Sequence, residues 1–219
     1  MTTLIRAPAA LLACLLTLAA PLAHAGAQIY EPLSASVQAA LHKAIADQAA
    51  PYLAFKTENE GREWLNAMSS RLAKRMPDRV AREEFLVTVH YEAKRAGLDP
   101  QLVLSLITVE SAFRKYAVST AGARGFMQVM PFWVKLIGGG SEHNLFHLRT
   151  NLRFGCTILR HYLDIENGDL FRALGRYNGS LGRAPYPNSV LQAWTGNWTY
   201  QLRAVDVAQD GRKAGSSAM

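Results

Sequence analysis

The sequence predicts a mainly α-helical protein, and three observations favour this class. Apolar residues recur every three or four positions over long stretches, which is the spacing that gathers side chains on one face of a helix. Signals that end one helix and begin the next stand together at residues 97–100. The run that follows, 102–109, is apolar around almost its whole circumference, as in a central, buried helix. With 219 residues, of which 49% are hydrophobic and 19% charged, the chain can bury one substantial core.

The first 25 residues have the pattern of an export signal. Arg6 is their only basic residue, an apolar run covers 11–23, and Ala-His-Ala at 23–25 offers the small-x-small sequence after which a signal peptidase cleaves. The mature chain is then expected to start near Gly26 and to work in the periplasm.

Two alternatives remain for this segment. A retained membrane anchor needs about 20 apolar residues, and Pro8 and Pro21 interrupt the run, so no stable membrane span is expected in the mature chain. Lipidation at Cys14 would give a lipid-anchored protein, although the apolar run continues past this cysteine. Loss of the signal leaves Cys156 as the only cysteine, which excludes an intramolecular disulfide and predicts a buried core thiol.

The charge balance indicates the kind of partner. The chain carries a formal charge of +7 at pH 7 and has a pI of about 9.6. An exported basic protein suggests an acidic polymer or surface as its partner, and the compartment disfavours nucleic acid. We interpret the densest basic cluster as a solvated helix face; it consists of Arg71, Lys74, Arg75, Arg79 and Arg82.

Residues 26–96 are predicted to form an N-terminal helical region. Two amphipathic stripes mark its first helices, and a third helix over 79–96 is closed by Gly97 as its C-terminal cap. The stripes consist of Val37, Leu41 and Ile45, and of Leu65, Met68, Leu72 and Met76. The sequence leaves open whether this region pads the core or docks a partner.

Further helices are predicted from their caps. Asp99 can cap a helix that begins at Pro100, where the missing N–H costs nothing. Glycines at 138–140 precede a predicted loop over 141–148.

The last part of the chain has two more cap signals. Asn151 is expected to cap a helix that runs to about Leu163, and Asp169 is expected to cap a short helix containing Tyr177. Little regular structure is predicted after Gly179, where glycine, proline, asparagine and tryptophan are frequent.

Glu110 is the only charged residue between Pro100 and Arg114. Desolvation by apolar neighbours and the negative end of the helix dipole should both raise the pKa of its carboxyl, toward about 6. Such an acid stays protonated near neutrality and can donate its proton to the leaving oxygen of a glycosidic bond. The alternative is an ordinary ion pair with Arg114, four residues on.

Three ordered motifs carry a family resemblance. They are Glu110-Ser111, the block STAGARGFMQVMP at 119–131, and Tyr177-Asn178-Gly179. Together they resemble the lytic transglycosylases of the soluble-lytic-transglycosylase (SLT) type, over about residues 97–179. Phe126 stands where leucine is commoner, and Arg176 stands where alanine usually precedes the tyrosine.

The resemblance implies a lysozyme-like SLT-type catalytic domain over 97–200, followed by a tail over 201–219. It implies cleavage of the MurNAc–GlcNAc β-1,4 bond of peptidoglycan glycan strands without a cofactor. Glu110 would act first as general acid and then as general base toward the sugar's own 6-hydroxyl, leaving 1,6-anhydroMurNAc ends. A hydrolytic muramidase on the same scaffold and a non-catalytic peptidoglycan-binding or assembly protein remain alternatives.

The resemblance also implies substrate-binding residues. Ser119 resembles the serine that binds the glycan or the catalytic carboxylate, Gln128 the glutamine that contacts the N-acetyl group, and Met130 the methionine of an apolar sugar subsite. Tyr177 resembles the tyrosine near the catalytic carboxyl group, and Asn178 could contact substrate or cap a helix. A turn residue at Ser119 and plain core packing at Met130 and Tyr177 are the alternatives.

Other polar residues are not assigned to the site. His143 and His147 lack a third ligand at useful spacing, so no metal site is expected. Arg176 is read as solvated or as a contact for an acidic stem peptide. Solvated or capping roles are predicted for the acids Glu142, Asp164, Glu166 and Asp169. A cell-wall or secretion-machinery partner is possible, and the sequence does not distinguish exo- from endo-cleavage.

Overall fold

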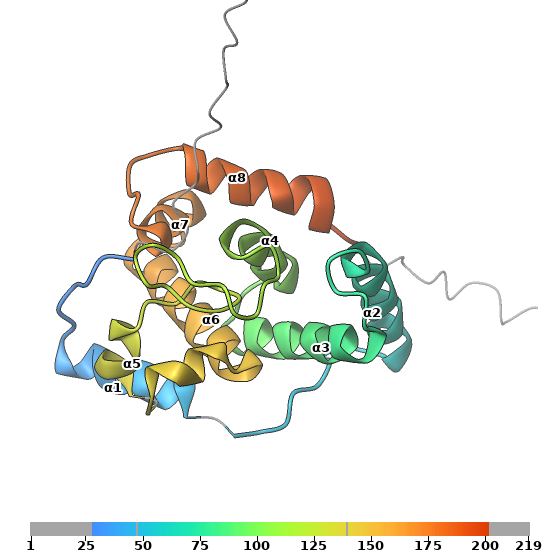
Figure 1. Ribbon diagram of the computed structural model, residues 1–219, viewed down its shortest axis with the longest axis horizontal. Coiled ribbons are helices and arrows are strands. Elements are labelled where there is room, and N and C mark those ends of the chain that lie inside the picture. Colours follow the sequence, from blue (N-terminus) through green and yellow to red (C-terminus); the bar gives the residue numbers. More distant parts are fainter. Residues whose placement is uncertain (1–27, 47, 139, 202–219) are drawn as a thin grey trace, which may run out of the picture.

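The computed structural model describes residues 28–46, 48–138 and 140–201, so the predicted export signal and most of the predicted tail lie outside the described residues. In these ranges the chain forms helices and loops, with two isolated β-bridges and no β-strand (Figure 1). The mainly α class is confirmed. The α-helices are α1 (Ala35–Ile45), α2 (Glu58–Leu72), α3 (Arg79–Arg95), α4 (Pro100–Glu110), α5 (Phe132–Ile137), α6 (Leu148–Ile165), α7 (Leu170–Asn178) and α8 (Pro185–Ala193).

Helix α4 is central, as its apolar sequence predicted. Figure 1 shows it between α3 and α8, and it packs against both. Val103, Leu104 and Ile107 are completely buried. Asp99 caps the helix by accepting the Gln101 N–H at 2.7 Å, with Pro100 in the first turn. The predicted start of this helix is therefore confirmed.

The helices predicted in the N-terminal region are also present. Helix α2 begins with a reciprocal capping box between Thr57 and Glu60, and α3 is capped by Asp78. Gly97 follows α3 with a φ of +66°, which a glycine adopts without a steric cost. Helix α1 packs on α5 and α6, and α2 packs on α3.

Glu92 of α3 anchors a buried network of charges. Its carboxylate is completely buried and receives Arg95 at 2.9 Å, Arg149 at 3.3 Å and Arg153 at 2.8 Å. The same arginines donate to backbone carbonyls at the end of α1 and just after it, at residues 44, 45, 48 and 49. The network therefore fastens α3, α6 and the end of α1 to one another.

Three expectations were wrong or incomplete. Asn151 does not cap α6, because the helix begins three residues earlier and Asn151 lies completely buried inside it. The expected loop 141–148 contains a 3₁₀-helix (Glu142–Phe146). The segment after Gly179, for which little regular structure was predicted, forms α8 and then a π-helical turn (Trp194–Trp198).

The basic cluster is not simply a solvated helix face. Arg82 is buried and donates to the hydroxyl of Ser69 and to the carbonyls of Met76 and Pro77. Arg71 holds the carbonyls at 197 and 199 beyond α8. The cluster therefore has a structural part as well as an exposed one.

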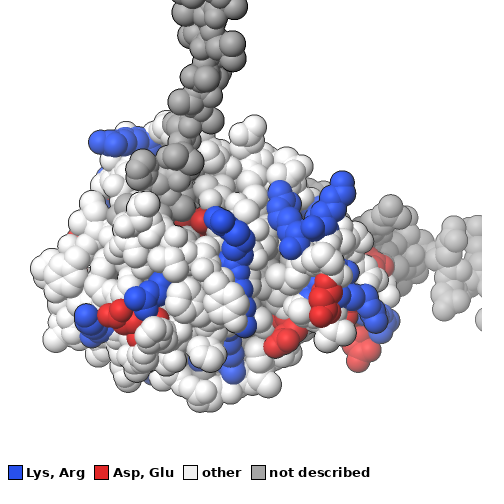
Figure 2. All heavy atoms as spheres, viewed as in Figure 1, with Lys and Arg blue, Asp and Glu red and all other residues white. Residues whose placement is uncertain are grey.

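Two further features concern what the protein can contact: the basic side chains on its surface and the length of its helices. Figure 2 shows a nearly continuous line of lysine and arginine side chains across the middle of one face. None of the helices in the described ranges is long and apolar enough to cross a bilayer.

Candidate active site

Glu110 is the last residue of α4, and the chain turns sharply after it. Ser111 ends the helix, and Ala112 and Phe113 then take left-handed φ values of 49° and 67°. Two consecutive non-glycine residues in this region are unusual and locally strained. The Ser111 hydroxyl donates to the Phe126 carbonyl at 2.7 Å. This bond ties the end of α4 to the loop that carries the second motif.

The carboxyl group of Glu110 is nearly removed from solvent. The residue is 4% exposed, and the Tyr186 hydroxyl donates a hydrogen bond to its Oε1. Oε2 is buried and has no hydrogen-bond partner among the described residues. Burial raises the pKa of Glu110 to about 8, and the Tyr186 bond opposes this shift. Glu110 therefore presents a protonated acid with one oxygen uncommitted.

The alternative ion pair between Glu110 and Arg114 is not formed. The Arg114 guanidinium instead donates to the Ser111 carbonyl at 3.0 Å, and the side chain is exposed. No cation therefore compensates the Glu110 carboxyl from this position. The direction of the predicted pKa shift agrees with the structure, and its size exceeds the prediction.

The second motif forms a loop between α4 and α5 that is held by its own polar groups. Ser119 accepts the Ala123 N–H through its hydroxyl at 3.1 Å, the role of a turn residue. Gln128 is buried and left-handed, with a φ of 46°. Its Nε2 donates to the Ala117 carbonyl at 3.1 Å and to the Gly125 carbonyl at 3.0 Å. The loop conformation thus depends on the side chain expected to bind sugar.

Asn151 of α6 supports this loop through hydrogen bonds to its backbone. Its Oδ1 accepts the Met127 N–H, and its Nδ2 donates to the carbonyls of Arg124 and Leu145, all at 2.8 Å. A Cβ atom on Gly125 would lie 2.4 Å from Asn151 Nδ2, so only glycine fits there. By forming hydrogen bonds with three backbone groups, the buried Asn151 side chain holds the loop in place against α6.

Helix α7 contributes the third motif. Tyr177 is completely buried and donates its hydroxyl proton to the Met127 carbonyl at 2.7 Å. Burial, followed by the nearby charge of Glu110, raises the pKa of Tyr177 well above its ordinary range. Asn178 is the buried last residue of α7, and Met130 lies half-buried at the other end of the loop. The fold therefore gathers the three motifs around the end of α4.

Tyr186 is the site residue that the sequence analysis missed. It comes from α8, in a stretch rich in proline and glycine where no helix was predicted. Burial raises the pKa of Tyr186 well above its ordinary range, so the hydroxyl remains a donor. Pro185 in the first turn and the spacing of Tyr186, Val190 and Trp194 were the available helix signal.

The charged residues that the sequence analysis left outside the site have partners of their own. Arg176 binds Glu166 and, at 3.2 Å, Glu31, so it is neither free in solvent nor directed at a substrate peptide. Asp169 caps α7 through the Arg172 N–H at 3.0 Å, as predicted. Glu142 pairs with Arg124 and Lys135, and Asp164 with Arg160.

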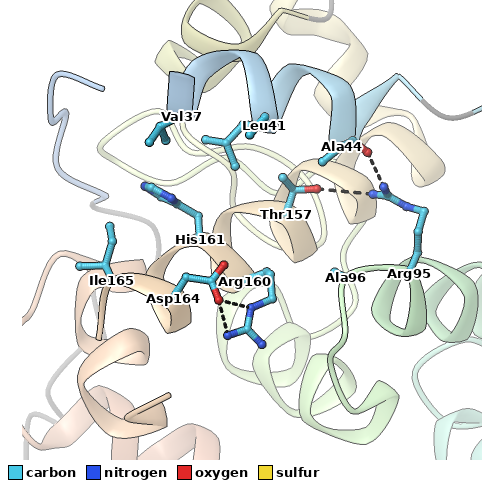
Figure 3. A pocket seen from close by; sticks show the side chains of 11 residues that line it. Val37, Leu41, Ala44, Arg95, Ala96, Thr157, Arg160, His161, Asp164 and Ile165 are labelled. Carbon is cyan, nitrogen blue, oxygen red and sulfur yellow. Dashed lines mark hydrogen bonds and ion pairs between the residues drawn. The ribbon is translucent and has the colours of Figure 1, made fainter. Parts of the chain in front are cut away.

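A separate hollow of about 530 Å³ lies between α1 and α6. Figure 3 shows its apolar wall on α1, formed by Val37 and Leu41, facing His161 and the ion pair of Arg160 with Asp164. None of the motif residues lines it. We therefore do not place the active site there.

The comparisons with known proteins concern the part of the chain that contains the three motifs. Residues 88–188 match the family model of the transglycosylase SLT domain, a range that includes all three motifs and Tyr186. The resemblance to SLT-type lytic transglycosylases predicted from the motifs is confirmed for this part of the chain. The match starts inside α3, whereas the predicted boundary lies between α3 and α4.

The similar proteins are longer than this chain. One is "Membrane-bound lytic murein transglycosylase C" of Glaesserella parasuis serovar 5 (strain SH0165), 48% identical over 118 residues, which cover 47% of this chain and 32% of the relative. Another is "Transglycosylase" of Enterobacteria phage PRD1, 31% identical over 112 residues, which cover 48% and 41%. The chain thus spans less than half the length of these relatives.

A solved structure of an inactive mutant of the lytic transglycosylase Slt from Pseudomonas aeruginosa also matches. It has a TM-score of 0.41 and 19% sequence identity, and the match covers 64% of this chain and 34% of that one.

Proposed function

We propose that this protein is a peptidoglycan lytic transglycosylase. It cleaves the MurNAc–GlcNAc β-1,4 bond and leaves 1,6-anhydroMurNAc ends. The observation that carries the proposal is Glu110, a buried carboxyl with a raised pKa that lies close to the three motifs. Its Oε2 has no hydrogen-bond partner in the part of the chain that the structure describes. The SLT-domain match and the printed names of the relatives support the same activity.

The mechanism begins with proton donation. Glu110 is protonated at neutral pH and gives its proton from Oε2 to the glycosidic oxygen, so the C1–O bond breaks and the GlcNAc hydroxyl leaves. The carboxylate that forms is stabilised by the hydrogen bond that Tyr186 donates to Oε1. This bond gains strength as negative charge develops, which favours the transition state over the bound substrate.

The second step returns the proton. The Glu110 carboxylate accepts the proton of the muramic 6-hydroxyl while that oxygen attacks C1. The glycan ends as a 1,6-anhydro sugar, Glu110 is protonated again, and no water is consumed. This route needs one carboxyl group, whereas an ordinary glycosidase needs two, about 5 to 9.5 Å apart.

The remaining motif residues are assigned to substrate binding. Gln128 commits its Nε2 to the loop, so we assign its Oε1 to the N-acetyl N–H of the sugar. Met130 would provide an apolar wall, and Ser119 and Asn178 would contribute polar contacts at the rim. Tyr177 would keep the loop close to Glu110 by holding the Met127 carbonyl.

We further propose that the enzyme works in the periplasm after removal of the export signal. The basic line on one face suits the carboxylates of peptidoglycan stem peptides (Figure 2). A cell-wall or secretion-machinery partner remains a prediction of the sequence analysis.

The test is digestion of purified sacculi followed by mass spectrometry of the products. Products one water lighter than reducing-end muropeptides support the transglycosylase. Reducing ends identify a hydrolytic muramidase instead, and glycan binding without cleavage identifies a non-catalytic protein.

The matched variant is Glu110→Gln. It should fold and bind glycan, and its cleavage rate should fall by about a thousandfold or more, because the amide cannot act as a general acid. Glu63→Gln on α2, whose carboxylate accepts an exposed hydrogen bond from Asn59, serves as the control and should cleave normally. Full activity of Glu110→Gln would refute the assignment.

A further inference from the structure

A residue from the far N-terminal side of the chain reaches the active-site loop. Gln28 is 4% exposed, and its Nε2 donates to the Gln128 carbonyl at 3.3 Å. Its Oε1 accepts the Met130 N–H at 3.1 Å. One primary amide therefore holds the backbone groups on both sides of residue 129, as a neighbouring β-strand would.

The residues after Gln28 are fixed to the same region. The Tyr30 ring meets the edge of Phe132 at 5.6 Å, and Glu31 accepts Arg176 of α7 at 3.2 Å. We call residues 28–31 the strap. Figure 1 shows the first described residues beside α7, from where the chain runs to α1.

The other end of this segment is fastened as well. Arg95 and Arg153 hold the carbonyls of Ala44 and Ile45 at the end of α1, and both arginines are paired with the buried Glu92. The strap is therefore not a loose end lying near the loop by chance. It is the first part of a segment anchored to the SLT domain at both ends.

Gln28 and Tyr177 converge on one short stretch of backbone. Tyr177 holds the Met127 carbonyl, and Gln28 holds the Gln128 carbonyl and the Met130 N–H. Gln128 in this stretch is left-handed, a conformation that costs a non-glycine residue free energy and persists only where its surroundings hold it.

We infer that Gln28 is a positioning residue of the active site: it holds the Gln128–Met130 backbone where the side chains of these residues meet the glycan. This inference rests on the proposed function. It assigns the beginning of the N-terminal region to the active site rather than to padding or to a partner.

Removal of Gln28 should change binding more than chemistry. Without its amide, the Gln128 carbonyl and the Met130 N–H lose their partner, and the left-handed residue is free to relax. Glu110 lies on α4 and Tyr186 lies on α8. The strap contacts described above join Gln28, Tyr30 and Glu31 to the loop, to α5 and to α7 instead. The acid should therefore keep its geometry while the sugar-binding loop shifts.

The test compares Gln28→Ala with Gln38→Ala in the full-length mature protein. The side-chain amide of Gln38 in α1 also donates to a backbone carbonyl, but that carbonyl belongs to Leu33 and not to the active-site loop. For each variant, kcat and KM are measured on soluble glycan strands, together with the thermal unfolding midpoint. In Gln28→Ala we expect KM to rise about tenfold to a hundredfold, while the pH dependence of kcat and the values for Gln38→Ala stay those of the wild type.

The outcomes separate the two proposals. A wild-type protein that does not cleave glycan contradicts the proposed function before Gln28 is considered. A cleaving wild type together with a Gln28→Ala variant of unchanged KM overturns the inference, whatever happens to its stability. A fall in kcat that follows the folded fraction, with KM unchanged, overturns it in the same way, since it shows a purely structural role.

Discussion

Two buried glutamates on neighbouring helices have opposite surroundings. Glu92 of α3 is completely buried and is bound by three arginines, at 2.8 to 3.3 Å. Glu110 of α4 is almost equally buried, but its bonded partner is a neutral tyrosine, and one oxygen has no partner among the described residues. Both carboxyl groups pay the desolvation penalty, and only Glu92 is compensated by positive charge.

The difference shows what makes a buried carboxyl reactive. Burial alone does not produce a proton donor, since arginines hold a buried carboxylate in its ionised form and occupy its lone pairs. Burial raises the pKa of Glu110, and the hydrogen bond from the neutral Tyr186 opposes this shift only in part. The helix also ends at Glu110, with the negative end of its dipole toward the carboxyl. Glu92 is therefore suited to stabilising the fold, whereas Glu110 is suited to donating a proton.

The largest effect is expected from removing the charge of Glu92, the glutamate that is paired with arginines. Glu92→Gln leaves three partly buried arginines without their carboxylate and should lower the free energy of unfolding by about 3 to 5 kcal/mol. Chemical unfolding in urea measures this loss. Glu58→Gln is the control, because its pair with Arg62 is exposed, and it should change stability by less than about 0.5 kcal/mol. A loss as small as that in Glu92→Gln would contradict the anchoring role of the network.

The raised pKa of Glu110 should make the free energy of unfolding depend on pH. The pKa of Glu110 is raised in the folded state from an ordinary 4.5 to about 8, so the stability that comes from its neutral form is complete below 4.5. This stability falls by about 1.4 kcal/mol per pH unit between the two values and is lost above the higher one. The difference in unfolding free energy between Glu110→Gln and the wild type should grow accordingly from about pH 5 to about pH 8. A difference that is constant with pH would mean that Glu110 titrates like a free glutamate.

The smallest expected effect comes from the neutral partner. Tyr186→Phe removes the hydrogen bond that lowers the pKa of Glu110, so this pKa should rise further and the alkaline limb of the pH–rate profile should move to higher pH. The rate at neutral pH should fall about tenfold, because the carboxylate formed in the first step loses a donor. Tyr52→Phe, at an exposed position, should leave both quantities unchanged. An alkaline limb that moves to lower pH in Tyr186→Phe would contradict the arrangement.

Local signals were sufficient for much of the fold. Asp99, Pro100 and Gly97 define helix ends within a few residues of sequence, and α4 begins where they predict. The burial of Glu110 also followed from its apolar neighbours. These features depend on contacts within a helix or its caps, which a sequence displays directly.

The errors concern residues whose roles depend on distant partners. Asn151 has the residue type of a helix cap, but its side chain saturates a loop 24 residues away in the chain. Tyr186 meets Glu110 across 76 positions, and Gln28 meets Gln128 across 100. No local spacing indicates such contacts. The motifs identified the loop and the acid, but not the residues that hold them.

Helix α6 joins the two regions compared above. Arg149 and Arg153, four residues apart, contact Glu92 from one face of the helix, and Asn151 between them contacts the loop 119–131 from the other face. A rotation of this helix by a single residue would therefore disconnect both. A substitution that displaces α6 is therefore expected to disturb both the loop 119–131 and the charge cluster that holds the end of α1, so a redesign of one part has to take account of the other.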